Sequence, residues 1–275
     1  MVLLKKFQLP FFFVIVIVNG AQGWFNFKKH LRLLPFFSDN SKKPIGPIEN
    51  YAPTESPYVP AIILKCIQEV ENRGMKIKNI YSRSEDYEKI ENLLEKLCFS
   101  KKKDNFSLRK HEPGVIAATL QFFLYYLKES IIPFYMIDNF QRALHNPSPN
   151  INLDNMLTKL SNINRNTLAV LIVHLQRVAD KQIIKKWKKI ELQRLAIIFG
   201  PILIHPNVTT IVQHSKDYMK SSRSIFQELL EVPGEYWNSI VKYSSIIDIK
   251  NSHEIIREED EDDYVQSASG GVSEE

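Results

Sequence analysis

Few residues of this sequence have the types and spacing that chemistry requires. The chain has seven histidines, and no two lie four positions apart, as two zinc ligands on one helix face would. It has no glycine-rich phosphate loop, no Ser-His-Asp arrangement and no cysteine nucleophile signature. His174 lies in an apolar helical segment, where a packed histidine is more common than a metal ligand. The sequence therefore predicts no metal site, no cofactor and no catalytic triad.

The cysteines and the glycosylation sequons depend on the compartment. Cys66 and Cys98 are a candidate disulfide in an oxidising environment, and the alternative is two buried thiols on helices. Asn105 and Asn207 each begin an Asn-X-Ser/Thr triplet and are candidate N-glycosylation sites. Such triplets also occur by chance, so the sequence alone leaves their use open.

The densest basic segment is 181–189, which contains five lysines and one tryptophan. A basic run with an aromatic residue inside it could contact anionic lipid or nucleic acid. Most charge runs are solvated, so a solvated loop between helices is the default expectation. We expect no nucleic-acid partner and keep an anionic membrane surface as an alternative partner.

The first 23 residues have the pattern of a secretory signal peptide. Lys5 and Lys6 supply the positive start, 9–18 is an unbroken apolar run, and 21–23 supplies small residues near the cleavage site. The apolar run is too short for a comfortable membrane span, although an uncleaved anchor is the alternative. We therefore expect 1–23 to be removed and the protein to be secreted.

Charge and composition divide the rest of the chain. Segment 24–43 is predicted to be an N-terminal extension, 44–245 a single domain, and 246–275 an acidic disordered tail. Eight acids and no Lys or Arg lie in 258–275, whereas 24–257 holds 34 basic and 23 acidic residues, a net +11. A body this basic favours an acidic partner, such as an acidic protein face or a membrane surface, and solubility alone is the alternative.

Apolar residues recur at helical spacing from Ala61 onward, and no alternating strand pattern competes. The sequence therefore predicts an all-α fold. The expected helices are 61–74, 87–97, 115–128, 134–144, 153–160, 168–178, 190–199 (closed by Gly200-Pro201) and 222–242.

Several of these segments together resemble one family. Segment 59–67 resembles the first core helix of the Rho-GTPase-activating (RhoGAP) domain, 160–178 its long helix, and 195–203 its C-terminal signature. The resemblance covers about 44–240 and implies a RhoGAP-type helical bundle that acts on Rho or Rac small GTPases. Together with the leader, it is also similar to the secreted venom RhoGAP proteins of parasitoid wasps, which disturb Rac-type GTPases of host blood cells. That likeness implies a secreted virulence factor with a host-cell GTPase as its partner.

The resemblance also indicates where a catalytic arginine would lie. In the family this arginine follows an isoleucine and an aromatic residue and precedes a variable residue, a serine and a glycine. Here Ile80 and Tyr81 fit, which makes Ser82 the arginine-finger position, with Arg83 one place late and Glu85 in place of the glycine. Serine is neutral and short, so we expect a regulator-like chain without GTPase-activating activity. The alternative is an active Rho/Rac activator that uses Arg83 in a remodelled loop.

The same alignment gives the candidate GTPase-facing residues. They are Ser82 and Arg83 on the loop, Gln121 and Tyr125 where the family carries a lysine and an arginine, and Arg194 where it carries an asparagine. A chain that keeps the apolar positions and changes the polar ones suits a domain released from catalysis. A membrane- or protein-binding module unrelated to GTPases is the remaining alternative.

Overall fold

The computed structural model describes residues 45–99, 107–181, 185–205 and 217–241. These residues form no β-strand and contain one isolated β-bridge, between Ser148 and Ile151, so the all-α prediction is confirmed. The helices and single turns are, in order, η1 (Ile48–Tyr51), α3 (Ala61–Glu69), η2 (Val70–Gly74), η3 (Ile80–Ser82), α4 (Tyr87–Phe99), α5 (Pro113–Tyr125), η4 (Phe134–Met136), α6 (Ile137–His145), α7 (Leu153–Thr158), α8 (Asn162–Asp180), α9 (Lys185–Leu203), α10 (Asp217–Glu231) and α11 (Gly234–Ile240).

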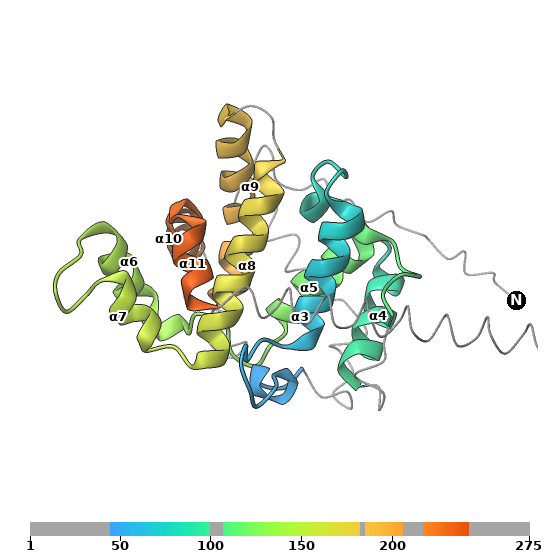
Figure 1. Cartoon of the computed structure of the whole chain (residues 1–275), viewed down its shortest axis with the longest axis horizontal. Coiled ribbons are helices and arrows are strands. Elements are labelled where there is room, and N and C mark those ends of the chain that lie inside the picture. Colours follow the sequence, from blue (N-terminus) through green and yellow to red (C-terminus); the bar gives the residue numbers. More distant parts are fainter. Residues whose placement is uncertain (1–44, 100–106, 182–184, 206–216, 242–275) are drawn as a thin grey trace, which may run out of the picture.

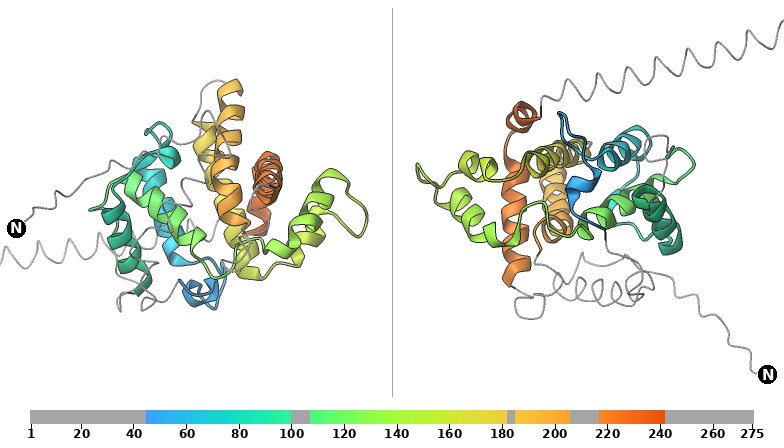
Figure 2. Two further views of the ribbon diagram at one scale, coloured as in Figure 1. Left: turned by 180° about the vertical axis from the view of Figure 1, so that it is seen from behind. Right: turned by 90° about the horizontal axis from the view of Figure 1, so that it is seen from below.

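Two long helices, α8 and α9, form the centre of the bundle (Figures 1 and 2). Helices α3, α4 and α5 lie on one side of this pair, and α6, α7, α10 and α11 lie on the other. Helix α10 packs along α9, α11 packs on α8, and α5 contacts α3, α4 and α9. Helix α5 therefore links the N-terminal helices to the central pair.

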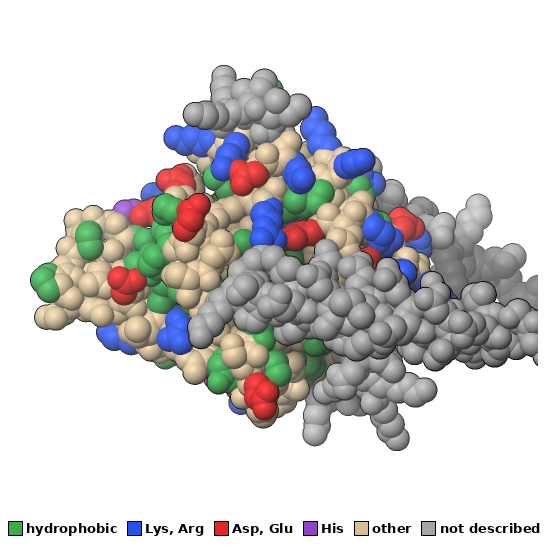
Figure 3. All heavy atoms as spheres, in the orientation of Figure 1, with side chains coloured by type: hydrophobic (Ala, Val, Ile, Leu, Met, Phe, Trp, Pro, Cys, Tyr) green, Lys and Arg blue, Asp and Glu red, His purple; other side chains and the backbone are tan. Residues whose placement is uncertain are grey.

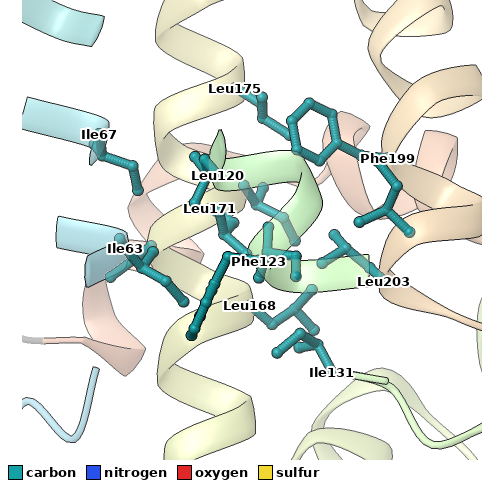
Figure 4. Packing of buried hydrophobic residues seen from close by; sticks show 14 of the residues in the cluster. Ile63, Ile67, Leu120, Phe123, Ile131, Leu168, Leu171, Leu175, Phe199 and Leu203 are labelled. Carbon is teal, nitrogen blue, oxygen red and sulfur yellow. The ribbon is translucent and has the colours of Figure 1, made fainter. Parts of the chain in front are cut away.

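The core is filled by apolar side chains that these helices direct at one another. Figure 4 shows residues of α3, α5, α8 and α9 converging, with Phe123 between Leu120, Leu168 and Leu171. Every residue of α5 from 114 to 124 is buried, which explains why this segment is apolar on all sides. Burial of so much apolar surface is the main force that holds the helices together.

Local signals explain where several helices begin. The side chain of Ser161 accepts a hydrogen bond from the backbone N–H of Asn164 (3.1 Å) and caps α8. Asn152 caps α7 in the same way through the N–H of Asn155 (2.9 Å). Pro113 occupies the first turn of α5, where its missing N–H costs no helical hydrogen bond.

The C-terminal helices differ from the predicted ones. Helix α9 begins at Lys185, inside the basic run predicted to be a loop, and it continues past Gly200-Pro201 to Leu203. Gly200 is needed for close packing: a Cβ there would lie 2.7 Å from the carbonyl oxygen of Ser222 on α10. The single helix predicted for 222–242 is two helices, because Pro233 cannot continue α10 and instead precedes α11.

Cys66 and Cys98 are buried free thiols, so the disulfide that the sequence allows is not formed in the structure. Burial, helped by the nearby Cys98 and Glu69, raises the pKa of the Cys66 thiol to about 12, which keeps it protonated and unreactive.

Several sequence-based predictions concern residues outside the described ranges. These are the signal peptide 1–23, the extension 24–43, the tail 246–275, and the sequons at Asn105 and Asn207. Over the ranges that are described, no helix is both long enough and apolar enough to cross a bilayer. The core formed by the described residues lies between 45 and 241, and the bounds 44–245 stay a prediction.

Candidate functional site

The loop between η2 and α4 carries the candidate residues Ser82 and Arg83. Asn79 has a left-handed backbone (φ 57°, ψ 36°), which asparagine tolerates better than most residues, and its carbonyl accepts a hydrogen bond from the N–H of Ser82 (2.7 Å). This turn buries Tyr81, after which the backbone becomes extended and the Arg83 side chain is 52% exposed. The loop is therefore anchored in the core directly before it reaches solvent.

Tyr81 is the anchor. Its ring meets the ring of Phe199 edge-on, with 4.9 Å between centroids, and its carbonyl accepts a hydrogen bond from the buried Gln121 amide (3.0 Å). Its hydroxyl lies 2.6 Å from Nε2 of His174. Burial, helped by the nearby Cys66 and Glu71, raises the pKa of Tyr81 well above 10. The hydroxyl therefore keeps its proton and donates a hydrogen bond to Nε2 of His174.

His174 continues this hydrogen-bond network to Glu71. If Nε2 accepts from Tyr81, Nδ1 carries the proton and donates to Oε1 of Glu71 at 2.9 Å. The same carboxylate accepts from Nη1 of Arg177 at 3.1–3.3 Å. Burial alone would raise the pKa of Glu71, but the hydrogen bond with His174 and the nearby Arg177 guanidinium together bring it below 4.5. A continuous network therefore connects the loop to η2 and α8.

We expect Glu71→Gln to lower the free energy of unfolding by about 1–3 kcal/mol at pH 7, because the polar groups around it lose a charged acceptor. The folded-state pKa of Glu71 is depressed, so its contribution is present above the unfolded-state pKa and is lost as pH falls through the folded-state value. Urea unfolding should therefore show a difference that shrinks below about pH 4.5. Glu88→Gln, on the exposed side of α4, is the control and should change stability by less than about 0.5 kcal/mol. A difference between Glu71→Gln and the unchanged chain that is the same at pH 7 and pH 3.5 would contradict this account.

Arg83 has one contact of its own on the loop. Its Nε donates to Oε1 of Glu85 at 3.2 Å, and the Glu85 side chain is only 10% exposed. The Glu85 carboxylate lies over Gly114 in the first turn of α5, where an added Cβ would be 2.0 Å from Oε1. The negative charge expected to oppose a nucleotide is thus held against the positive end of a helix and paired with an arginine.

The other candidate residues lie on α5 and α9, in different surroundings. Gln121 is buried and supports the loop from beneath, which differs from the GTPase-facing position predicted for it. Tyr125, one turn further along α5, is partly exposed and its ring lies tilted beside His205, with 5.4 Å between ring centroids. Arg194 is 15% exposed and pairs with Glu191 one turn back on α9.

The first turns of α9 carry exposed apolar residues in the basic segment and directly after it. Trp187 is 55% exposed and Ile190 is 44% exposed, close in sequence to Lys188 and Lys189. This combination keeps contact with an anionic membrane as a prediction. Within the described residues, no group of three or more His, Cys, Asp or Glu side chains could hold a metal ion.

Sequence reasoning missed the partners that fix the loop. Glu71 lies on η2, ten residues before Tyr81, and nothing in its sequence context distinguishes it from a solvated glutamate. The contact between Glu85 and Gly114 joins two segments whose proximity only the packing of α5 against the loop creates. His174, predicted to be a packed histidine, is buried and hydrogen bonded.

Comparison with known proteins gives these features a family context. A family model for the RhoGAP domain matches residues 60–208. Rac GTPase-activating protein 1 of Mus musculus is 31% identical over 205 residues, which are 71% of this chain and 31% of that protein. The breakpoint cluster region protein of Homo sapiens is 28% identical over 200 residues, 70% of this chain and 16% of that protein. The chain spans about a third or less of the length of these curated relatives.

Solved structures share the fold. The crystal structure of human Rho GTPase activating protein 15 aligns with a TM-score of 0.55 at 23% identity and covers 68% of this chain and 88% of that one. The BH domain from GRAF, the GTPase regulator associated with focal adhesion kinase, aligns with a TM-score of 0.51 at 23% identity and covers 66% of this chain and 93% of that one. At this identity the likeness supports the helical fold alone.

These matches correct one prediction. The expectation of a chain without GTPase-activating activity, drawn from Ser82, is wrong in view of a family and relatives defined by that activity. A serine at position 82 does not by itself exclude the activity, because an exposed arginine stands next to it and is paired with Glu85. The family model matches more than half of the residues of this chain, and the helical bundle agrees with the fold of the solved structures. The chain therefore belongs to the RhoGAP domain family.

Proposed function

We propose that this chain stimulates GTP hydrolysis by a Rho-family small GTPase, and that Arg83 provides the positive charge that the reaction needs. The observation that carries the proposal is the exposed side chain of Arg83, which lies two residues after the buried Tyr81 on the loop where η3 packs against α5 and α9. Membership of the family supports the proposed activity, and the exposed position of Arg83 on the loop supports its proposed role.

The chemistry requires a cation at the transferring phosphoryl group. Negative charge spreads over the phosphate oxygens in the transition state, and an arginine supplied by an activating protein is worth about 10³–10⁵ in rate. Ser82 carries no charge to supply. Arg83 is one residue further along, and neighbouring Cα atoms are about 3.8 Å apart, a displacement that the long arginine side chain helps to span.

A Rac-like GTPase is the partner that we propose to test first. One relative is named for activating Rac, and a basic body suits an acidic protein face. Figure 3 shows Lys and Arg side chains along the upper part of one face, with Asp and Glu between them. With the signal pattern of 1–23 and the likeness to wasp venom proteins, we also propose that the chain is secreted and acts on a GTPase of another cell.

The test is single-turnover hydrolysis of GTP by purified Rac-type and Rho-type GTPases with increasing amounts of the full chain. We expect a saturable acceleration for at least one of them, because a positioned guanidinium lowers the barrier by several kcal/mol. Binding to the GTP-bound form without any acceleration would contradict the proposed activity while leaving the interaction intact.

A further inference from the structure

Arg83 and Glu85 point to the same side of the loop. The backbone at Arg83 is extended (φ −77°, ψ 149°) and leads the chain away from the turn that buries Tyr81. The hydrogen bond between Arg83 Nε and Glu85 Oε1 (3.2 Å) shows that the two side chains lie together.

Glu85 is held from its other side by α5. Its carboxylate fills the space above Gly114 that any larger residue would need, since a Cβ there would lie 2.0 Å from Oε1 and 2.6 Å from Cδ. Gly114 is in the first turn of α5, where the backbone N–H groups give a positive potential that favours a carboxylate. The neighbouring acid Glu112 has its own cation, Lys89, at 3.1 Å. Glu85 is thus the fixed partner of the pair, and Arg83 is the exposed one.

The contact uses the part of the guanidinium that catalysis does not need. A guanidinium has five N–H donors, one on Nε and four on the two terminal nitrogens. Glu85 accepts from Nε, and no hydrogen bond within the described residues involves the terminal nitrogens of Arg83. Those four donors are the ones that bind phosphate oxygens in two-pronged contacts.

We infer that Glu85 is a positioning residue: anchored over Gly114, it holds Arg83 by Nε so that the terminal nitrogens are presented to the phosphates of a bound GTPase. This inference rests on the proposed function. It gives the departure from the family pattern a role, since the glutamate at 85 accompanies the arginine at 83. A displacement of about 1 Å in a catalytic group can cost about 10²-fold in rate, so the anchor matters for rate more than for binding.

The experiment measures single-turnover GTP hydrolysis by a Rac-type GTPase at increasing concentrations of the full chain. Glu85→Ala should lower the maximal rate about 10–100-fold and leave the half-saturating concentration within about threefold. Glu85→Gln keeps an acceptor for Nε and should retain more of the rate than Glu85→Ala. Gly114→Ala places a methyl group where the Glu85 carboxylate lies, so it should displace Glu85 and reproduce the loss of rate. Glu88→Ala removes an equal charge from an exposed position nearby and should change neither parameter.

A second background separates positioning from a general effect of charge. In a chain carrying Ser82→Arg and Arg83→Ser, the arginine no longer lies two positions from Glu85. Glu85→Ala should then leave the maximal rate unchanged within about twofold. Circular dichroism of each variant verifies that the fold is retained.

The outcomes distinguish the inference from the proposed function. If Arg83→Ala reduces the rate while Glu85→Ala does not, the positioning role is wrong and the proposed function stands. A higher rate for Glu85→Ala would mean that the glutamate restrains the arginine, and a change in half-saturating concentration alone would assign it to binding; either result overturns the inference. No acceleration by the unchanged chain removes the proposed function and the inference with it.

Discussion

Arg83→Ala is expected to reduce the acceleration of GTP hydrolysis by about 10³-fold or more while the chain still binds the GTPase. The loop is anchored by the buried Tyr81, so removing an exposed side chain next to it leaves the rest of the surface in place. The loss reflects the missing guanidinium, whose contribution in such reactions is about 10³–10⁵. Single-turnover hydrolysis with a Rac-type GTPase measures the rate, and binding to the GTP-bound form measures the affinity.

Two comparisons refine the test of Arg83. Arg83→Lys keeps the charge but loses the planar, two-pronged donor arrangement, so most of the acceleration should still be lost. Arg142→Ala removes an exposed arginine from α6, on the other side of the central helix pair, and should have no effect. Full acceleration by Arg83→Ala would exclude this residue as the catalytic arginine, although the family assignment would stand.

Phe199→Ala is expected to lower the free energy of unfolding by about 3–5 kcal/mol. Phe199 is fully buried in α9, its ring meets Tyr81 at 4.9 Å and lies 6.5 Å from Phe226 of α10, and its removal leaves a cavity at this junction. The aromatic contacts add about 0.5–1.5 kcal/mol to the loss of burial. Urea unfolding monitored by circular dichroism measures the change.

The same substitution should affect the site, because Tyr81 loses the ring that it packs against. Phe199→Leu keeps most of the volume and should cost roughly 1–2 kcal/mol, with a smaller effect on hydrolysis. A loss below about 1.5 kcal/mol for Phe199→Ala would mean that the junction collapses around the missing ring. The loop would then depend on Gln121 and His174 more than on Phe199.

The loop thus combines a rigid base with an exposed tip. Tyr81 is held through its ring, its hydroxyl and its carbonyl by three different helices, α9, α8 and α5. The network continues through His174 to Glu71 and Arg177, so the base is fixed by both packing and hydrogen bonds. Catalysis by an arginine requires this arrangement, because the gain in rate depends on a donor that is positioned before the GTPase arrives.

The sequence by itself determined the fold class and the family. Apolar spacing in α5 and α8 is strong enough to predict helices locally, and the segment 195–203 has the family's pattern. Sequence alone also indicated the loop between residues 80 and 85 as the candidate catalytic loop. It failed for α9 because a run of lysines and a Gly-Pro pair are usually signals of a loop and of a helix end.

Only the tertiary structure decided what those loop residues can do. Gly200 permits α10 to approach α9 closely, and Gly114 permits Glu85 to lie on α5, which are contacts between segments distant in the chain. The sequence shows a serine where an arginine is expected and a glutamate where a glycine is expected. Packing brings that glutamate to a helix end and to Arg83, because burial of α5 against the loop fixes the distance between them. The charges of these residues can be read from the sequence. The groups that they contact depend on which helices the core packs together.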